Sequence, residues 1–207
     1  LRSSVHATSA APEPSVATDG SGAAYVAWTD ERNGDTDIYA ARGTYSGGNY
    51  TFGAEVRVDD DTGSSGAKQP SVAFYSANVY VTFSDERNGN WDIYLATLDS
   101  GLAAATNNVK VSDDDGTGNQ YEPAIAVDSA TGEIYIVFTD ERFEGASIYF
   151  ASSGTTDPYR PNVRIDDDKG TAVQAQPDIT YSSRIYVVFG DARDLNENIY
   201  FTRSPKE

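Results

Sequence analysis

Short apolar runs alternate with polar turns along the chain, and this pattern is typical of β-strands. The runs are rich in Val, Ile, Tyr, Phe and Trp, and Gly, Asn, Asp and Pro bound them. Four of the runs read AYVAWTD, VYVTFSD, IYIVFTD and IYVVFGD. No segment shows the sustained period of an amphipathic helix. The hydrophobic pattern therefore predicts an all-β protein.

One unit of sequence is written four times. The copies begin at Pro14, Pro70, Pro123 and Pro177, and each contains a Pro-Ser-Val-Ala-like opening, an apolar run ending in Asp-x-Arg, and an Ile-Tyr pair. The second strands are apolar on both alternating faces, which indicates sheets stacked between sheets. We therefore predict a β-propeller of four four-stranded blades, with repeats of about 54 residues, in a single domain spanning 1–207. The expected repeats are 14–69, 70–122, 123–176, and 177–207 together with 1–13.

The fourth copy ends after its third strand. The N-terminal stretch LRSSVHATSAAPEP lines up with VRVDDDTGSSGAKQP, which contains the fourth strand of the first copy. We therefore expect the N-terminal strand to complete the last blade and to close the ring. The alternative is that residues 1–11 are a linker and that the four blades belong to a larger ring.

Composition excludes several classes of function. The 207 residues include no Cys and only one His, so disulfide scaffolds, thiolate zinc sites and cysteine nucleophiles are excluded. Fifteen basic and 32 acidic residues give a net charge of −17, which repels a nucleic-acid backbone. No apolar run is long enough for a membrane helix. We expect no nucleic-acid partner and no membrane insertion, and the acidic, cysteine-free composition suggests a secreted or cell-surface microbial protein.

The repeats resemble a known class of propellers. The segment VYVTFSDERNGNWDIYLATLDSG resembles the sialidase-like (Asp-box, or BNR) repeat propellers, and its core SDERNGNWDIY is also similar to the repeats of TolB-type propellers. Thr97-Leu98-Asp99-Ser100-Gly101 matches the first half of the Asp-box pattern but lacks its aromatic residue. The resemblance implies a propeller fold. It does not name an activity, because such propellers include hydrolases, lectins and passive surface modules.

An Asp-x-Arg turn follows the second strand of every copy. A sialidase would need an arginine cluster that binds a carboxylate, but an active site recruits different residues from different blades. These arginines recur in the same position, so we interpret the pairs as structural ties between a strand and its turn or the next blade. The eight residues are Asp30, Arg32, Asp85, Arg87, Asp140, Arg142, Asp191 and Arg193.

Acidic triplets end the first three copies. Two of them match D-x-D-x-G and the third is a near variant, and alternating carboxylates followed by a glycine suit a hard cation such as Ca²⁺. The expected ligands are Asp59, Asp61, Asp113, Asp115, Asp166 and Asp168. The alternative is that these residues are solvated turn formers whose side chains bond to backbone N–H groups.

The Asp-x-Arg turns, the acidic triplets and the turns with Trp91 and Phe143 are expected on one acidic face. An aromatic ring beside Asp and Asn groups suits contact with a glycan or a peptide. The alternative is that both rings pack between blades. Our main hypothesis is a non-catalytic propeller module that binds a glycan or protein at the cell surface through this acidic loop face. The alternative is a sialidase-like glycoside hydrolase or a carbohydrate-binding lectin.

Overall fold

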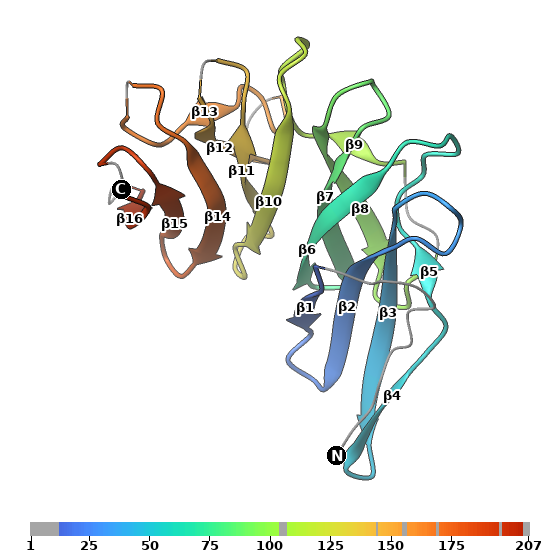
Figure 1. Cartoon of the computed structure of the whole chain (residues 1–207). Coiled ribbons are helices and arrows are strands. Elements are labelled where there is room, and N and C mark those ends of the chain that lie inside the picture. Colours follow the sequence, from blue (N-terminus) through green and yellow to red (C-terminus); the bar gives the residue numbers. More distant parts are fainter. Residues whose placement is uncertain are drawn as a thin grey trace.

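A computed structural model describes residues 13–103, 107–143, 145–154, 157–168, 170–194 and 196–204. These residues form four antiparallel sheets and no helix, so the all-β prediction is confirmed for this part of the chain (Figure 1). None of the described residues forms a helix with the length and hydropathy needed to cross a membrane.

Each sheet is built from consecutive strands, and we number the sheets 1 to 4 in chain order. Sheet 1 contains β1 (Ser15–Thr18), β2 (Ala23–Asp30), β3 (Asp37–Ser46), β4 (Asn49–Phe52) and β5 (Val56–Arg57). Sheet 2 contains β6 (Ala67–Tyr75), β7 (Asn78–Asp85), β8 (Asp92–Asp99) and β9 (Val109–Lys110). Sheet 3 contains β10 (Gln120–Val127), β11 (Ile134–Asp140), β12 (Ser147–Ser152) and β13 (Val163–Arg164). Sheet 4 contains β14 (Gln174–Tyr181), β15 (Ile185–Asp191) and β16 (Asn198–Arg203).

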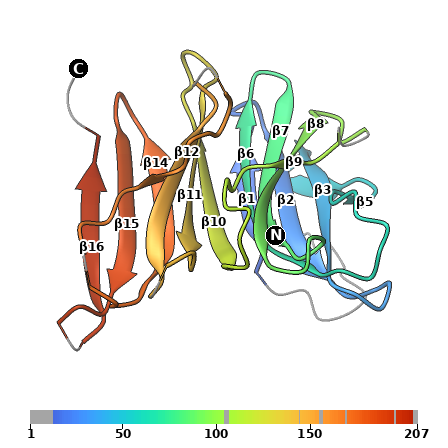
Figure 2. The same cartoon turned by 90° about the horizontal axis from the view of Figure 1, so that it is seen from above.

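Successive sheets pack face to face, as the two-sided apolar strands predict. On β7, Val81 and Phe83 lie in the core shared with sheet 1, whereas Tyr80 contacts the core shared with sheet 3. A third core joins sheets 3 and 4. The first strands β1, β6, β10 and β14 follow one another along the inside of an arc, as Figures 1 and 2 show. This stacking of twisted sheets is the arrangement of propeller blades.

A recurrent bulge links the inner strands to one another. The residue before each repeat's proline has a positive φ, between 54° and 62°, and three of the four inner strands shift register there. Its side-chain oxygen accepts the N–H of the same residue in the next sheet. The bonds run from Gln69 N–H to Glu13 Oε2 (2.9 Å), from Glu122 N–H to Gln69 Oε1 (3.0 Å) and from Gln176 N–H to Glu122 Oε2 (2.7 Å). We call this series the inner relay.

The strand count differs from four per sheet at both ends. Sheet 1 has five strands, because Gly47 and Gly48 with positive φ close an extra hairpin between β3 and β4. Sheet 4 has three described strands, and its expected fourth strand falls on residues 1–12, which lie outside the described part. The described sheets form an open arc, with β1 and β14 well apart (Figures 1 and 2). Four blades, ring closure and the domain limits therefore stay predictions.

Candidate functional site

The Asp-x-Arg turns have the same geometry in all four sheets. The aspartate at the end of the second strand is buried and accepts both the backbone N–H and the guanidinium of its arginine, at 2.8–2.9 Å and 2.5–2.6 Å. The guanidinium lies over the tyrosine of the Ile-Tyr pair, 4.0–4.4 Å from the ring centroid. In sheet 1, the hydrogen bond from Arg32 lowers the pKa of Asp30 to about 2.

Three of these arginines also reach the preceding sheet. Arg87 pairs with Asp60 (2.6 Å), Arg142 with Asp113 (2.8 Å) and Arg193 with Asp167 (2.7 Å), so each arginine joins its own turn to an acidic triplet. Arg32 pairs instead with Glu55 of its own sheet, at 2.6 Å. The arginines are therefore distributed along the arc, three of them at successive sheet junctions, rather than gathered around one ligand.

Three successive positions of each acidic triplet loop have distinct partners. At the first, Asp59 and Asp166 accept the N–H groups of Ile38 (2.7 Å) and Ile148 (2.9 Å). Ser112 does the same for Ile93, at 3.2 Å. The middle position binds the next sheet's arginine. The third accepts the N–H of a glycine two residues later, and its members are Asp61, Asp114 and Asp168.

These partners correct the predicted alignment of the second triplet with the other two. Asp113 lies in the middle position, and Asp114, not Asp115, is the counterpart of Asp61. The alignment of the three aspartates was shifted by one position, because Ser112 stands at the first position of this loop and Asp115 follows the third. Among the described residues, no group of three or more acidic or histidine side chains has the geometry of a metal site. Calcium binding by these loops stays a prediction.

The two irregular aromatic residues of the acidic face have different surroundings. Trp91 is half-buried, and Lys68 Nζ lies 3.9 Å from the centroid of its ring. Phe143 is exposed on its turn. The expected role of both side chains in ligand binding stays a prediction.

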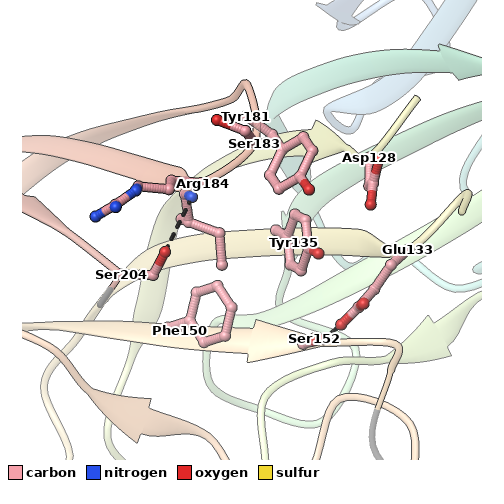
Figure 3. A pocket seen from close by; sticks show the side chains of 10 residues that line it. Asp128, Glu133, Tyr135, Phe150, Ser152, Tyr181, Ser183, Arg184 and Ser204 are labelled. Carbon is pink, nitrogen blue, oxygen red and sulfur yellow. Dashed lines mark hydrogen bonds between the residues drawn. The ribbon is translucent and has the colours of Figure 1, made fainter. Parts of the chain in front are cut away.

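A hollow lies between sheets 3 and 4, on the side of the molecule opposite to the acidic face. Its volume is about 670 Å³, and it is bordered by the β10–β11 and β14–β15 turns and the end of β12 (Figure 3). We call it the Tyr135 cavity. The lining residues are Asp128, Glu133, Tyr135, Phe150, Ser152, Tyr181, Ser183, Arg184, Ile185 and Ser204.

Aromatic rings form the floor and one wall of the Tyr135 cavity. The ring of Tyr135 stacks on Phe150 at 6.0 Å and meets Tyr181 at 5.3 Å with a 32° tilt. Figure 3 shows the hydroxyl groups of both tyrosines turned toward the acidic side of the cavity. Burial, together with the charge and hydrogen bond of Glu133, raises the pKa of Tyr135. Its hydroxyl is therefore a neutral hydrogen-bonding group across the physiological range.

Two carboxylates face these rings. Asp128 accepts the N–H of Ala130 and the hydroxyl of Thr131, both at 2.8 Å, and these bonds together with one from Tyr181 lower its pKa. Glu133 accepts the hydroxyl of Ser152 at 2.5 Å. Both groups therefore have fixed positions, and their remaining lone pairs can accept hydrogen bonds from a ligand.

The sequence did not indicate the Tyr135 cavity. The turns that border it vary between the copies, and on the strands Tyr181 is the only tyrosine at its repeat position, where Phe74 and Val127 stand in sheets 2 and 3. Gly154 lies directly against the cavity, because a Cβ there would clash with the Glu133 carboxylate. This steric constraint cannot be read from one sequence.

Comparisons with known proteins support the fold. No family model matches the chain, and no curated protein matches significantly. Among solved structures, an α-L-arabinanase from Penicillium chrysogenum with bound arabinobiose is 15% identical, with a TM-score of 0.62, and the match covers 94% of this chain and 62% of that one. An α-L-arabinofuranosidase from Fusarium graminearum is 13% identical, with a TM-score of 0.61 and coverages of 88% and 59%.

A third similar structure agrees with the resemblance found in the repeats. A Hadza microbial sialidase is 13% identical, with a TM-score of 0.59, and the match covers 96% of this chain and 47% of that one. The chain spans about three fifths of the length of the two enzymes above and about half of the sialidase. At these identities the likeness shows the fold alone. The chain therefore has a sialidase-like β-propeller fold.

Proposed function

We propose that the protein is a carbohydrate-binding β-propeller of a secreted or cell-surface protein, with the Tyr135 cavity as its sugar site. The observation that carries the proposal is the juxtaposition of a tyrosine pair and two fixed carboxylates in one hollow. Sugars have apolar faces that stack on aromatic rings and hydroxyl groups that donate to carboxylates. The structural neighbours include enzymes of arabinose-containing and sialic-acid-containing glycans, which favours this function over a passive spacer.

A second candidate is glycoside hydrolysis in the same cavity. The observation that favours it is the placement of Glu133 beside Tyr135 in the cavity (Figure 3), because a glutamate beside a tyrosine is the pair that a sialidase-like mechanism uses. Arg184 is the only basic residue that lines the cavity among the described residues. A single arginine is a weak substitute for the cluster that binds a sialic-acid carboxylate, so binding is our first proposal.

Calorimetric titration of the protein with arabinobiose and with sialyllactose measures the affinity for each sugar and tests the proposal. We expect binding of at least one sugar, and we expect Tyr181→Ala to weaken it about tenfold or more, the scale of one lost stacking contact. Phe143→Ala is the matched control, because it removes an aromatic ring from the acidic face. Loss of binding in Phe143→Ala but not in Tyr181→Ala would move the site to the acidic face. Release of free arabinose from arabinobiose, or of free sialic acid from sialyllactose, would establish hydrolysis.

A further inference from the structure

The outer face of sheet 4 carries exposed apolar side chains. Ile199 on β16 is 79% exposed, whereas its counterparts Ile38, Ile93 and Ile148 are completely buried against the next sheet. Phe201, two residues further along β16, is 60% exposed. Each repeat therefore carries an apolar face for the sheet that follows it, and in sheet 4 no described residue covers that face.

The outer face of sheet 1 is likewise not covered by any residue that the structure describes. Val16 on β1 is 65% exposed, whereas Val72, Ile125 and Ile179 at the same repeat position are 7–8% exposed because the preceding sheet covers them. A hollow of about 440 Å³ lies beside this residue. It is lined by apolar side chains of Val16, Ala24, Val26 and Phe52 and by the β3–β4 hairpin with Tyr45 and Tyr50.

Hydrogen-bonding groups are also open at the two ends of the arc. In the inner relay, the side chain at each position accepts an N–H from the next sheet, but the side chain of Gln176 has no partner among the described residues. Likewise, no described residue accepts the N–H of Glu13. One end therefore offers an acceptor and the other a donor, in the positions that the relay uses within the chain.

We propose that the outer face of sheet 4 binds the outer face of sheet 1 of a second copy of this chain, head to tail. A second copy is the occupant that the repeat positions specify, because its sheet 1 carries the same type of face that sheets 2, 3 and 4 present to their predecessors. The two faces of one copy lie at opposite ends of the arc, as both views show (Figures 1 and 2). Ile199 and Phe201 would pack on the face that contains Val16, and Gln176 would accept the N–H of Glu13.

This contact joins two different surfaces, so each added copy presents a fresh face to the next one. Such heterologous association yields a closed ring if the rotation between copies closes, and an open chain of copies otherwise. The net charge of −17 on each copy opposes the contact at low ionic strength. Association should therefore strengthen when NaCl is added, unlike association held by ion pairs.

Sedimentation velocity of the purified chain over a wide range of concentration is the direct test. We expect oligomers that grow with protein concentration and with NaCl. Phe201→Asp and Val16→Asp should each weaken association at least tenfold, because a charge then enters an apolar contact. Val109→Asp, at an exposed valine on β9, is the matched control and should associate like the unmodified chain. Since all three side chains are exposed, melting curves should show that the variants fold.

Mixing the two end variants gives the sharpest test. Phe201→Asp keeps an intact sheet 1 face and Val16→Asp keeps an intact sheet 4 face, so a mixture should form a one-to-one dimer that grows no further. A monomer at every concentration would overturn the proposal, and would be the result if the same chain covers both faces. Oligomers that both aspartate variants form as well as the unmodified chain would also overturn it.

Discussion

The junction between sheets 2 and 3 differs from the junction between sheets 3 and 4, although both are built from the same repeat. At the first junction, Tyr159 from the loop after β12 is buried in the core beside Tyr80. Leu102 has the same role between sheets 1 and 2. At the second junction, no described residue occupies that place beside Tyr135, and the Tyr135 cavity is open instead.

This difference shows that the strands and the loops contribute separately to the junction. The strands place a tyrosine toward the next sheet in every repeat, at Tyr25, Tyr80, Tyr135 and Tyr186. The loop after the third strand of the following sheet decides whether the space beside that tyrosine is filled. A filled junction stabilises the stack, and an unfilled one leaves a hollow that a ligand can enter.

Tyr159→Ala should have the largest effect on this comparison, because it empties the filled junction. We expect the free energy of unfolding to fall by about 3–5 kcal/mol, the cost of truncating a buried aromatic side chain. Urea denaturation measures the loss. Tyr45→Ala, at an exposed tyrosine, should cost less than about 1 kcal/mol. Equal losses in the two variants would show that Tyr159 does not fill the junction.

The arginine ties offer a second comparison of the same junctions. Arg142→Ala should cost about 3 kcal/mol, because Asp140 is left buried and charged and Asp113 loses its partner. Arg193→Ala should cost about 1 kcal/mol less, since its second partner Asp167 is 85% exposed. Denaturant titrations of both variants measure the difference, and a larger loss in Arg193→Ala would contradict it.

The cost of Arg142→Ala should also depend on pH. Burial already raises the pKa of Asp140 with Arg142 present. Without the arginine, the carboxyl group of Asp140 binds its proton more tightly in the folded protein than in the unfolded chain. The free energy of unfolding of the variant therefore rises as the pH falls. The deficit of the variant should therefore shrink between pH 7 and about pH 4. Arg142→Lys, which keeps the positive charge, should show a smaller deficit that changes less with pH.

Gly154→Ala should affect the open junction more mildly. The new methyl group would displace the Glu133 carboxylate and break its bond from Ser152, at a cost of about 1 kcal/mol. If the Tyr135 cavity binds sugar, the affinity should fall about tenfold while the fold is kept. Calorimetry and melting curves separate the two effects. Gly63→Ala, which places a methyl group near Asp61 far from the cavity, is the control.

A last prediction concerns calcium at the triplet loops, which border each junction on the acidic side. If these loops bind Ca²⁺ in the folded state only, the melting temperature should rise in CaCl₂ relative to EDTA, because a hundredfold excess over Kd adds about 2.7 kcal/mol to the free energy of unfolding. The ionic strength must be matched with NaCl, because screening also stabilises an acidic chain. Identical melting curves would remove the metal assignment.

The sequence alone determined the sheets of this protein. Alternation of apolar and polar residues encodes which side of a strand is buried, and the recurrence of Asp-x-Arg and Ile-Tyr marks equivalent strands. Both signals are local, so the all-β class, the four repeats and the apolar faces on both sides of β7 could be predicted. The extra β3–β4 hairpin could not, because nothing in the repeat requires it.

Only the tertiary structure decided how loops and sheets meet. Spacing made Asp113 and Asp115 look like partners of one cation, whereas the fold places Asp113 against Arg142 and lets Ser112 cap Ile93. The Tyr135 cavity and the exposure of Ile199 likewise depend on what a neighbouring sheet or loop supplies. The physical reason is that a strand's pattern of apolar and polar residues is local to its sequence, while the burial and the partners of a side chain depend on segments brought near it by folding.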